Sequence, residues 1–404
     1  MRFIPFVAKR FIRVKRREFF RSLTTVFSIS GITIGVATLV VVLSVMNGME
    51  DDLRNKILGA SGHIIVTKFY GETIDNPDWV VDTLKKVTSA IVGYTPFIYT
   101  KILIKHNNAT DGIILRGVDP KTFKEVNIIP KKIISGKFEL GENGVVLGNY
   151  LADGLGAHIG DTIEISSPYS GIKTPFGLIP SRKECIVRGI FDAGMYEINA
   201  TIAIVSLNTA RNLLHIKGVT GIEFNIKNIY KAQQLSKEFI LTLGYPYRVR
   251  NWINMNKNLF AALKLEKVTM FIILTLIVLV AAFNITSILI MIVSEKTREI
   301  GILKALGATG KKIMGIFLLD GIFVGGFGTS LGLSIGYALC WALGKYKFIS
   351  LPSDVYFIDK LPVHMQISDF IIVGISAFLL SFIATIYPAR RASKLDPVEA
   401  IRNE

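Results

Sequence analysis

The sequence contains few of the residues that staple small secreted domains or bind metal ions. Its two cysteines, Cys185 and Cys340, fall in segments of different character, so we expect no disulfide bond. Its five histidines are scattered along the chain without the close pairing that is typical of a metal site. We therefore expect neither a disulfide-stabilised fold nor a metal centre.

Motifs of catalysis and nucleotide binding are also missing. No nucleophile-elbow, zinc-protease or dinucleotide-binding pattern occurs in the chain. Gly310-Lys311 is the nearest approach to a phosphate-binding loop, but Ala305 stands where that loop needs its first glycine, and Lys312 replaces the magnesium-binding serine or threonine. We expect no catalytic residue and no cofactor bound by this chain. Any energy-driven work would use ATP and magnesium on a separate ATPase subunit.

Long apolar runs dominate the sequence instead. The mean hydropathy is +0.45, whereas a soluble chain of this size would lie near or below zero. A helix crosses a bilayer with about 20 residues. The first run is too long for a cleavable signal peptide and should remain as a membrane anchor. Four runs are long enough to span the membrane: 23–46, 268–293, 313–343 and 370–387.

The orientation of these spans is predicted by their flanking basic residues, because segments rich in lysine and arginine stay in the cytoplasm. Residues 1–22 contain eight such residues, 294–312 contain five and 388–404 contain four. Segment 344–369 has three, balanced by three aspartates. We expect both termini and the 294–312 turn to be cytoplasmic. Contacts of these segments with anionic lipid explain much of the net charge of +16, so nucleic acid is not an expected partner.

The expected fold is a membrane protein with four transmembrane α-helices and a large α+β extracytoplasmic domain, residues 47–266, inserted between the first two helices. Short β-branched runs bounded by turn residues predict strands, and Asn76-Pro77 is typical of a helix start. A helix from Asn254 should run directly into the second span at Val268. Strands are predicted at His63–Lys68, Ile102–His106, Ile113–Gly117, Thr162–Ser166, Ile186–Ile190, Ile202–Val205 and Ile222–Ile226, and helices at Trp79–Ser89, Asn208–Ile216 and Lys231–Leu243.

The N-terminal segment, 1–22, alternates phenylalanines with its basic residues. This pattern is typical of an amphipathic helix that lies in the headgroup plane on the cytoplasmic side. A disordered basic flank is the alternative.

The segment Glu295–Ala308 has the sequence EKTREIGILKALGA and joins two predicted spans. It carries apolar residues at helical spacing on a turn that should face the cytoplasm. Such a helix can dock into a groove on a nucleotide-binding partner; a simple basic membrane anchor is the alternative. The predicted ATPase-coupling residues are Glu299, Ile302, Leu303, Lys304, Leu306 and Gly307.

Two of the spans are rich in small residues spaced four apart, which lets helix backbones approach closely, either within one chain or between two copies. The third span also carries an acid, Asp320, for which structural pairing near the cytoplasmic end is favoured over a proton-coupled role. The small residues are Gly31 and Gly35 in the first span, and Gly321, Gly325, Gly328, Gly332 and Gly336 in the third.

Four segments together resemble a known family. They are Phe6–Ser22, Val41–Glu50, Glu295–Ala308 and Tyr387–Arg402, and they are similar to the lipoprotein-releasing ABC permeases of the LolC/LolE type, within the FtsX/MacB superfamily. The last two are superfamily-wide signals, whereas the first two, including the VMNG sequence after the first span, are more specific to the lipoprotein-releasing branch. Asp320 departs from the amide that is usual in the family.

The resemblance implies a bacterial inner-membrane complex of this permease with a second copy or a paralogue and cytoplasmic ABC ATPase subunits. That complex extracts lipoprotein cargo from the membrane lipid and passes it to a periplasmic carrier for delivery to the outer membrane. The resemblance also implies a cavity for the acyl chains; ordinary lipid-facing or core packing is the alternative. The cavity positions are Val40, Leu43, Met46, Phe260, Leu263 and Phe271.

Residues Tyr169–Lys183 resemble the loop by which one branch of the family recruits its carrier. Prolines stiffen this loop, and exposed apolar residues on it would indicate a partner. A buried internal hairpin is the alternative. The predicted carrier-binding residues are Pro175, Phe176, Leu178, Ile179, Pro180, Arg182 and Lys183.

The rival interpretation is a mechanotransmission subunit of the MacB or FtsX kind, serving efflux or the control of cell-wall hydrolysis. The usual MacB form has a fused ATPase domain, for which residues 1–22 leave no room, and FtsX proteins usually have a smaller outer domain. An intramembrane enzyme is disfavoured because the sequence has no catalytic constellation.

Overall fold

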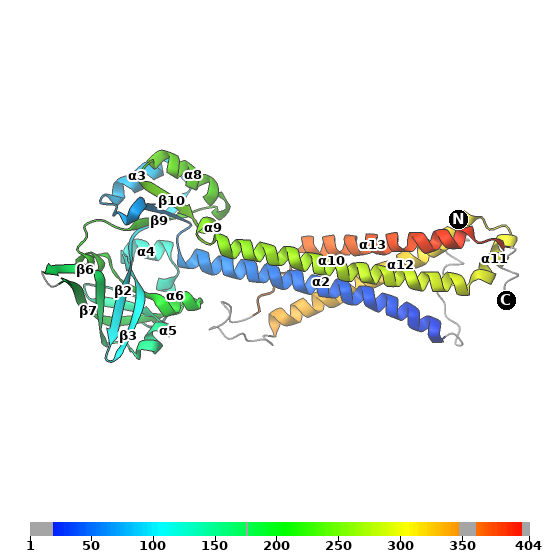
Figure 1. Cartoon of the computed structure of the whole chain (residues 1–404), viewed down its shortest axis with the longest axis horizontal. Coiled ribbons are helices and arrows are strands. Elements are labelled where there is room, and N and C mark those ends of the chain that lie inside the picture. The colour runs from blue at the N-terminus through cyan, green and yellow to red at the C-terminus, as the bar shows by residue number, and fades with distance from the viewer. Residues whose placement is uncertain (1–18, 175–176, 347–360, 398–404) are drawn as a thin grey trace. The chain divides into compact units, whose positions relative to one another are not determined.

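The computed structural model describes residues 19–174, 177–346 and 361–397 (Figure 1). The chain divides into two compact units. We call the first the helical unit; it comprises Met1–Asp51, Ala262–Ile349 and Leu361–Glu404. The second, Asp52–Ala261 with Ser350–Lys360, is called the α/β domain. The predicted N-terminal amphipathic helix lies almost wholly outside the described residues.

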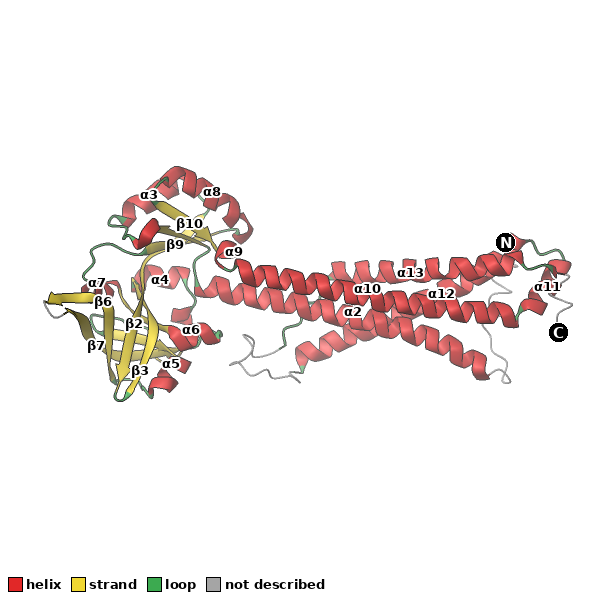
Figure 2. Cartoon of the chain, viewed as in Figure 1, coloured by secondary structure: helices red, strands yellow, loops and turns green. Residues whose placement is uncertain are grey.

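The helical unit contains long helices coloured red in Figure 2. Three of the described helices are long and apolar enough to cross a membrane: α12, α13 and the Ile29–Ala60 part of α2. The predicted span 268–293 lies within α10, a helix of 39 residues. The bounds are α2 Phe19–Ala60, α10 Lys257–Glu295, α11 Thr297–Ala305, α12 Gly310–Lys345 and α13 Ile367–Lys394.

Glycines on α12 set the distance to its neighbours within the helical unit. A Cβ atom built on Gly332 would come within 2.7 Å of Val36 Cβ on α2, so only glycine allows this approach. On another stretch of α12, a Cβ atom on Gly325 would meet Ser381 Cβ of α13 at 2.7 Å. The glycines of α12 that are spaced four apart thus pack the helices of one chain together, the first of the two possibilities for this pattern.

The α/β domain is built on a ten-stranded mixed sheet within the described residues. The strand order is β10-β1-β9-β2-β3-β8-β5-β7-β4, and β6 pairs with both β2 and β7. The bounds are β1 Ile64–Lys68, β2 Ile91–His106, β3 Ala109–Val118, β4 Ile133–Gly136, β5 Gly144–Gly148, β6 Thr162–Thr174, β7 Gly177–Phe191, β8 Ile202–Ser206, β9 Gly221–Ile226 and β10 Tyr247–Asn251.

These pairings close part of the sheet into a barrel. The path β2–β3–β8–β5–β7–β6 returns to β2, so six strands have no free edge along it. Strands β9, β1 and β10 continue the sheet beyond β2, where α3 and α8 lie (Figure 1). The helices of the domain are α3 Pro77–Val87, α4 Pro120–Val126, α5 Asn149–Leu155, α6 Tyr196–Thr201, α7 Leu207–Leu214, α8 Ala232–Leu243 and α9 Trp252–Met255.

All the predicted strands and helices of the domain are present, with shifted ends. Asn76 is the N-cap of α3, where its side chain accepts the Trp79 N–H at 3.1 Å, and Pro77 is the first helical residue. Strand β2 was predicted only from Ile102 but begins at Ile91, because its first part, including Pro96, pairs with β9. A short helix, α9, and Asn256 separate β10 from α10, which then continues without interruption to Glu295.

Candidate functional site

The predicted coupling segment forms α11, a helix of nine residues between α10 and α12. Its inner face is packed, since Ile300 is 1% exposed and Leu303 lies partly buried against the same apolar cluster. Its outer face is open, because Ile302 is 45% and Leu306 80% exposed. The structure therefore separates the predicted apolar residues: Ile302 and Leu306 are available for docking, whereas Leu303 holds α11 in place.

The polar coupling residues also have separate tasks in the structure. Lys304 Nζ donates to the backbone oxygens of Ser393, at 3.0 Å, and of Leu395, at the C-terminal end of α13. Glu299 forms an ion pair with Lys296 one turn earlier. Gly307 has φ +95°, a conformation that favours glycine and ends the helical turn. Lys304 thus orients α11, while Glu299 remains half exposed on its surface.

The described part of α10 presents a long apolar face that no other described residue covers. Phe271 is 60%, Val280 67% and Phe283 64% exposed. Such a face belongs in lipid, against acyl chains or against another subunit.

The predicted cavity residues of the helical unit differ in their exposure. Val40 is 1% exposed and packs on Gly336 of α12, so it faces the interior of the helical unit. Leu43 packs on the same cluster, and Leu263 is also buried. Met46 is half-buried. Of these positions in the helical unit, Phe271 alone is open.

Phe260 belongs to the α/β domain. Its ring lies edge-on against Trp252, with centroids 5.2 Å apart, beside the domain core. It is a packing residue of that domain in this structure.

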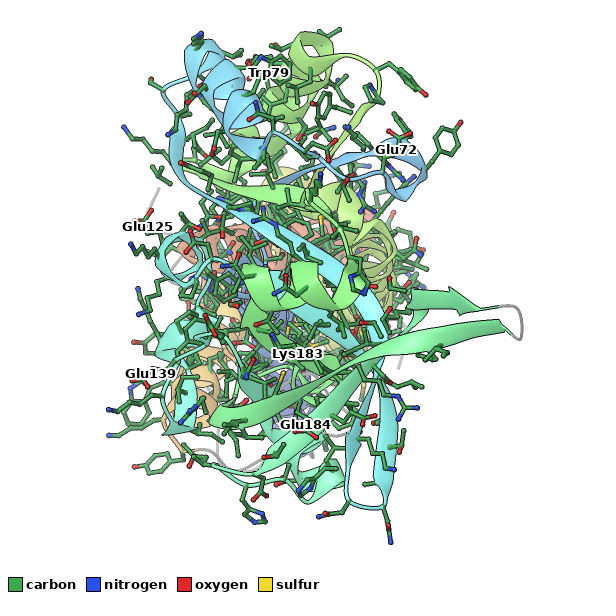
Figure 3. The ribbon with its side chains drawn as sticks, turned by 90° about the vertical axis from the view of Figure 1, so that its left-hand side faces the viewer. Glu72, Trp79, Glu125, Glu139, Lys183 and Glu184 are labelled. Carbon is green, nitrogen blue, oxygen red and sulfur yellow. The ribbon has the colours of Figure 1, made fainter. Side chains whose placement is uncertain are left out.

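The predicted carrier loop is the end of a long hairpin formed by β6 and β7. Figure 3 shows this hairpin extending away from the rest of the domain. Pro180 pairs with Gly171 across the hairpin, and Ile179 is 56% exposed. Pro175 and Phe176 lie outside the described residues, as does the side chain of Leu178. The described part favours a projecting hairpin over a buried one.

The two basic residues of the loop lie nearer to the body of the domain. Arg182 is 3.5 Å from Glu164 on β6, and Lys183 donates to the backbone oxygen of Glu142 at 3.1 Å. Figure 3 labels Lys183 where the hairpin joins the sheet. These contacts fix the base of the hairpin, so the projecting apolar residues are the better candidates for a partner.

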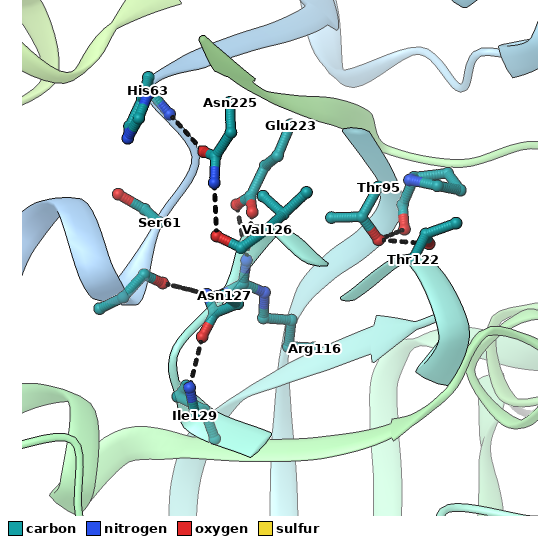
Figure 4. A network of polar contacts seen from close by, with 12 residues as sticks. Ser61, His63, Thr95, Arg116, Thr122, Val126, Asn127, Ile129, Glu223 and Asn225 are labelled. Carbon is teal, nitrogen blue, oxygen red and sulfur yellow. Dashed lines mark hydrogen bonds and ion pairs between the residues drawn. The ribbon is translucent and has the colours of Figure 1, made fainter. Parts of the chain in front are cut away.

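A buried charge network lies where α2 ends in the α/β domain (Figure 4). Arg116 on β3 and Glu223 on β9 are each under 5% exposed, and the guanidinium reaches both carboxylate oxygens at 2.6 Å. Arg116 also donates to the backbone oxygen of Ala60 at 3.1 Å, as does the side-chain amide of Asn127 at 2.6 Å. The backbone oxygen of Ala60, the last residue of α2, is therefore bound by two side chains of the α/β domain.

The electrostatics of this network reflect its burial. Burial raises the pKa of Glu223, and the Arg116 guanidinium and the Gly62 amide oppose that rise. Burial also raises the pKa of the nearby Tyr99 phenol and lowers that of His63. This buried pair was not predicted from the sequence. The available signal was a single charge inside each of two apolar strands, IILRGV and GIEFNI.

No group of three or more potential ligands that could hold a metal ion occurs among the described residues. Both cysteines are free and buried. Burial raises the pKa of the Cys185 thiol to about 11, so this residue is an inert part of the domain core.

Comparison with known proteins follows the same division of the chain. The family model FtsX-like permease C-terminal matches residues 271–397, and the model MacB-like periplasmic core domain matches residues 25–239. In solved structures, the periplasmic region of MacB from Actinobacillus actinomycetemcomitans aligns at 15% identity and a TM-score of 0.34, covering 52% of this chain and 97% of that one. Together the long helices and the two family models define an FtsX-like membrane permease with an extracytoplasmic MacB-like domain.

Relatives that match over nearly the whole of both chains identify the family within this class. The chain is 36% identical to the lipoprotein-releasing system transmembrane protein LolC of Neisseria meningitidis serogroup B, over 98% of both chains. It is 29% identical to the LolE protein of Haemophilus influenzae, again over 98% of both. The chain belongs to the family of lipoprotein-releasing system transmembrane proteins, as its motifs predicted.

Proposed function

We propose that this chain is the permease subunit of an ATP-driven complex that extracts lipoproteins from the bacterial inner membrane and passes them to a periplasmic carrier. The observation that carries the proposal is the similarity to lipoprotein-releasing relatives over 98% of both chains. The chain itself is non-catalytic, and ATP and magnesium are used by a separate cytoplasmic ATPase. A second copy or a paralogue completes the permease.

The topology that we propose has four spans, with α10 as the second, and both termini in the cytoplasm. The basic residues beside the spans and the length of α10, 39 residues, support it. Impermeant thiol labelling tests the orientation. A cysteine placed at Pro120 should react from outside the membrane, and one placed at Ala305 should not; reaction of the second would reverse the topology.

Coupling to the ATPase is assigned to the open face of α11. Ile302 and Leu306 would bury their side chains in a groove of the partner, and each buried side chain of this size contributes about 2 kcal/mol. Lys304 supports this role because it fixes the orientation of α11.

Cargo binding is assigned to the exposed apolar face of α10 around Phe271, since acyl chains need such a surface. Carrier binding is assigned to the projecting end of the β6–β7 hairpin, around Ile179. Val40 and Phe260 are better explained by packing, and we do not assign them to the cargo surface.

The decisive experiment is purification of the chain with its native partners, followed by identification of the bound proteins by mass. We expect an ABC ATPase and acylated lipoproteins, and release of those lipoproteins to a soluble carrier when ATP is added. A complex that retains an ATPase but binds no lipoprotein, and that controls efflux or a cell-wall hydrolase instead, would favour the mechanotransmission alternative.

A further inference from the structure

Helix α13 is tied to the other helices of the helical unit by polar contacts at both ends and near its middle. Its C-terminal contact is with α11, where Lys304 Nζ donates to the backbone oxygens of Ser393 and Leu395. These are among the last carbonyl groups of the helix, which have no partner within the helix itself. A cation at this end is also favoured by the helix dipole. Any movement of α11 therefore acts directly on α13.

The middle contact depends on a proline. Pro388 lies inside α13 and has no N–H, so the backbone oxygen of Ala384 loses its usual partner four residues later. The hydroxyl of Thr286 on α10 lies 3.0 Å from that oxygen and 3.1 Å from the backbone oxygen of Ala282, so its one hydrogen is shared between the two acceptors. The proline of the YPARR sequence thus creates an acceptor on α13 that α10 uses.

The N-terminal contact centres on Asn47 of the VMNG sequence. Its amide nitrogen donates to Asp369 Oδ2 in the first turn of α13 at 2.5 Å. Its amide oxygen accepts from Lys267 Nζ of α10 at 3.1 Å. Asn47 is 4% exposed, and both of its polar atoms are used. One neutral side chain on α2 therefore bridges an anion on α13 and a cation on α10.

The segment before α13 lies closely along α2 at the same place. A Cβ atom on Gly48 would come within 2.4 Å of the Pro362 oxygen, so glycine is required there. The His364 N–H donates to the backbone oxygen of Ser44 at 2.9 Å, and the His364 ring contacts Asp51. The Asn47 bridge therefore lies where α2 and the segment before α13 are closely packed, and it is buried rather than a surface contact.

We infer that α13 relays movement of α11 to α2 and α10, and that Asn47 is the positioning residue at which this movement is delivered. Asp369 and Ser393 are separated by about 36 Å of helix, at 1.5 Å per residue. This inference rests on the proposed function and assigns a specific task to the VMNG sequence. It predicts that weakening the Asn47 bridge uncouples ATP hydrolysis from lipoprotein release.

The test uses nearly isosteric variants in the full complex, reconstituted in liposomes with its ATPase, partner permease and carrier. Asn47→Asp places a carboxylate against Asp369 while keeping the acceptor for Lys267. We expect lipoprotein released per ATP hydrolysed to fall by about tenfold, as for loss of a hydrogen bond to a charged group, with ATP hydrolysis nearly unchanged. The double variant Asn47→Asp/Asp369→Asn restores one donor facing one carboxylate. We expect it to recover most of the lost coupling.

The control is Asn76→Asp, the same change at the N-cap of α3, where either side chain accepts the Trp79 N–H. It should leave release per ATP unchanged. Normal coupling in Asn47→Asp, or no recovery in the double variant, would overturn the inference. If Asn47→Asp does not assemble, recovery of assembly and coupling in the double variant decides the question in the same way. Absence of lipoprotein release by the unaltered complex would instead reject the proposed function.

Discussion

The α/β domain and the helical unit use polar groups in opposite ways. The domain buries a complete ion pair, Arg116 with Glu223, in the middle of its sheet. In the helical unit, Lys304 and Lys267 donate instead to uncharged oxygens, those of the backbone and of the Asn47 amide, and glycine, serine and threonine lie between the helices. Removing a charge should therefore destabilise the domain, whereas the helical unit should stay folded and lose its coupling.

The largest effect is expected from Arg116→Met, which leaves Glu223 buried without its counter-ion. Breaking a buried pair in this way costs about 3–5 kcal/mol of unfolding free energy. Burial raises the pKa of Glu223, so the carboxyl is most easily tolerated when protonated. The loss should be smallest near pH 4.5 and should grow as the pH rises through the folded-state pKa.

Urea unfolding of the full chain in detergent, followed by circular dichroism at several pH values, measures this loss. The matched variant is Arg116→Met/Glu223→Leu, which removes both charges and should recover much of the stability. If the single and double variants are equally unstable, packing and the Ala60 contact explain the loss better than charge does.

A smaller effect is expected from a side chain added between the helices. Gly332→Leu forces α12 away from Val36 on α2, where a Cβ atom already meets a neighbour at 2.7 Å. Overpacking of this kind costs about 1–3 kcal/mol. Gly344→Leu, on the same helix with no atom within 4 Å of the added Cβ, is the control. Thermal aggregation in detergent should separate the two; equal stability would show that α2 moves aside freely.

The same substitution should have different effects at Leu303 and at Leu306, the two leucines of the predicted coupling segment. Leu306 is 80% exposed, so Leu306→Asp should leave the chain folded and weaken ATPase binding by roughly tenfold or more, because a carboxylate is costly in an apolar groove. Leu303 is packed inward, so Leu303→Asp should lower thermal stability as well. Co-purification of the ATPase and a thermal melt measure both. Normal ATPase binding and cargo release in Leu306→Asp would leave α11 as a membrane anchor.

The same contrast explains what could be predicted from the sequence. The lengths of the apolar runs predicted the long helices, and the short strands followed from β-branched runs. Closure of the barrel through β6 could not be predicted, because the sequence of a strand does not show that it will pair with both β2 and β7. Local patterns also did not reveal which face of α11 is packed, since Leu303 and Leu306 are chemically identical.

At the candidate site, the main features that could not be predicted from the sequence were contacts between segments far apart in the chain. Asn47 was part of a recognised motif, but its partners Lys267 and Asp369 lie more than 200 residues away in sequence. The sequence shows that Pro388 leaves a backbone oxygen without its usual N–H partner, but it does not show that Thr286 is the donor to that oxygen. Motifs identified the family, and only the fold shows that two of them, α11 and the end of α13, are in contact.

A substitution at the end of the β6–β7 hairpin tests whether this hairpin binds the carrier. Ile179→Ser should weaken capture of the carrier several-fold, because a half-exposed isoleucine that becomes buried contributes about 1–2 kcal/mol. Ile159→Ser changes another isoleucine, 43% exposed, elsewhere on the domain and is the control. Pull-down of the carrier by the assembled complex measures capture. Equal capture of the carrier by both variants would show that Ile179 does not bind the carrier.

The smallest effect is expected at Cys185, whose side chain lies in the domain core. Because burial raises the pKa of its thiol to about 11, the group stays protonated and unreactive in the folded domain at pH 8. The raised pKa contributes stability below the ordinary value of 9.0, and this contribution is lost as the pH rises towards 11. A thiol reagent added at pH 8 should therefore modify Cys185 only after urea unfolds the domain. A cysteine introduced at the exposed Ile179 should react at once in the same protein; rapid reaction of Cys185 itself would show that the barrel opens in the native state.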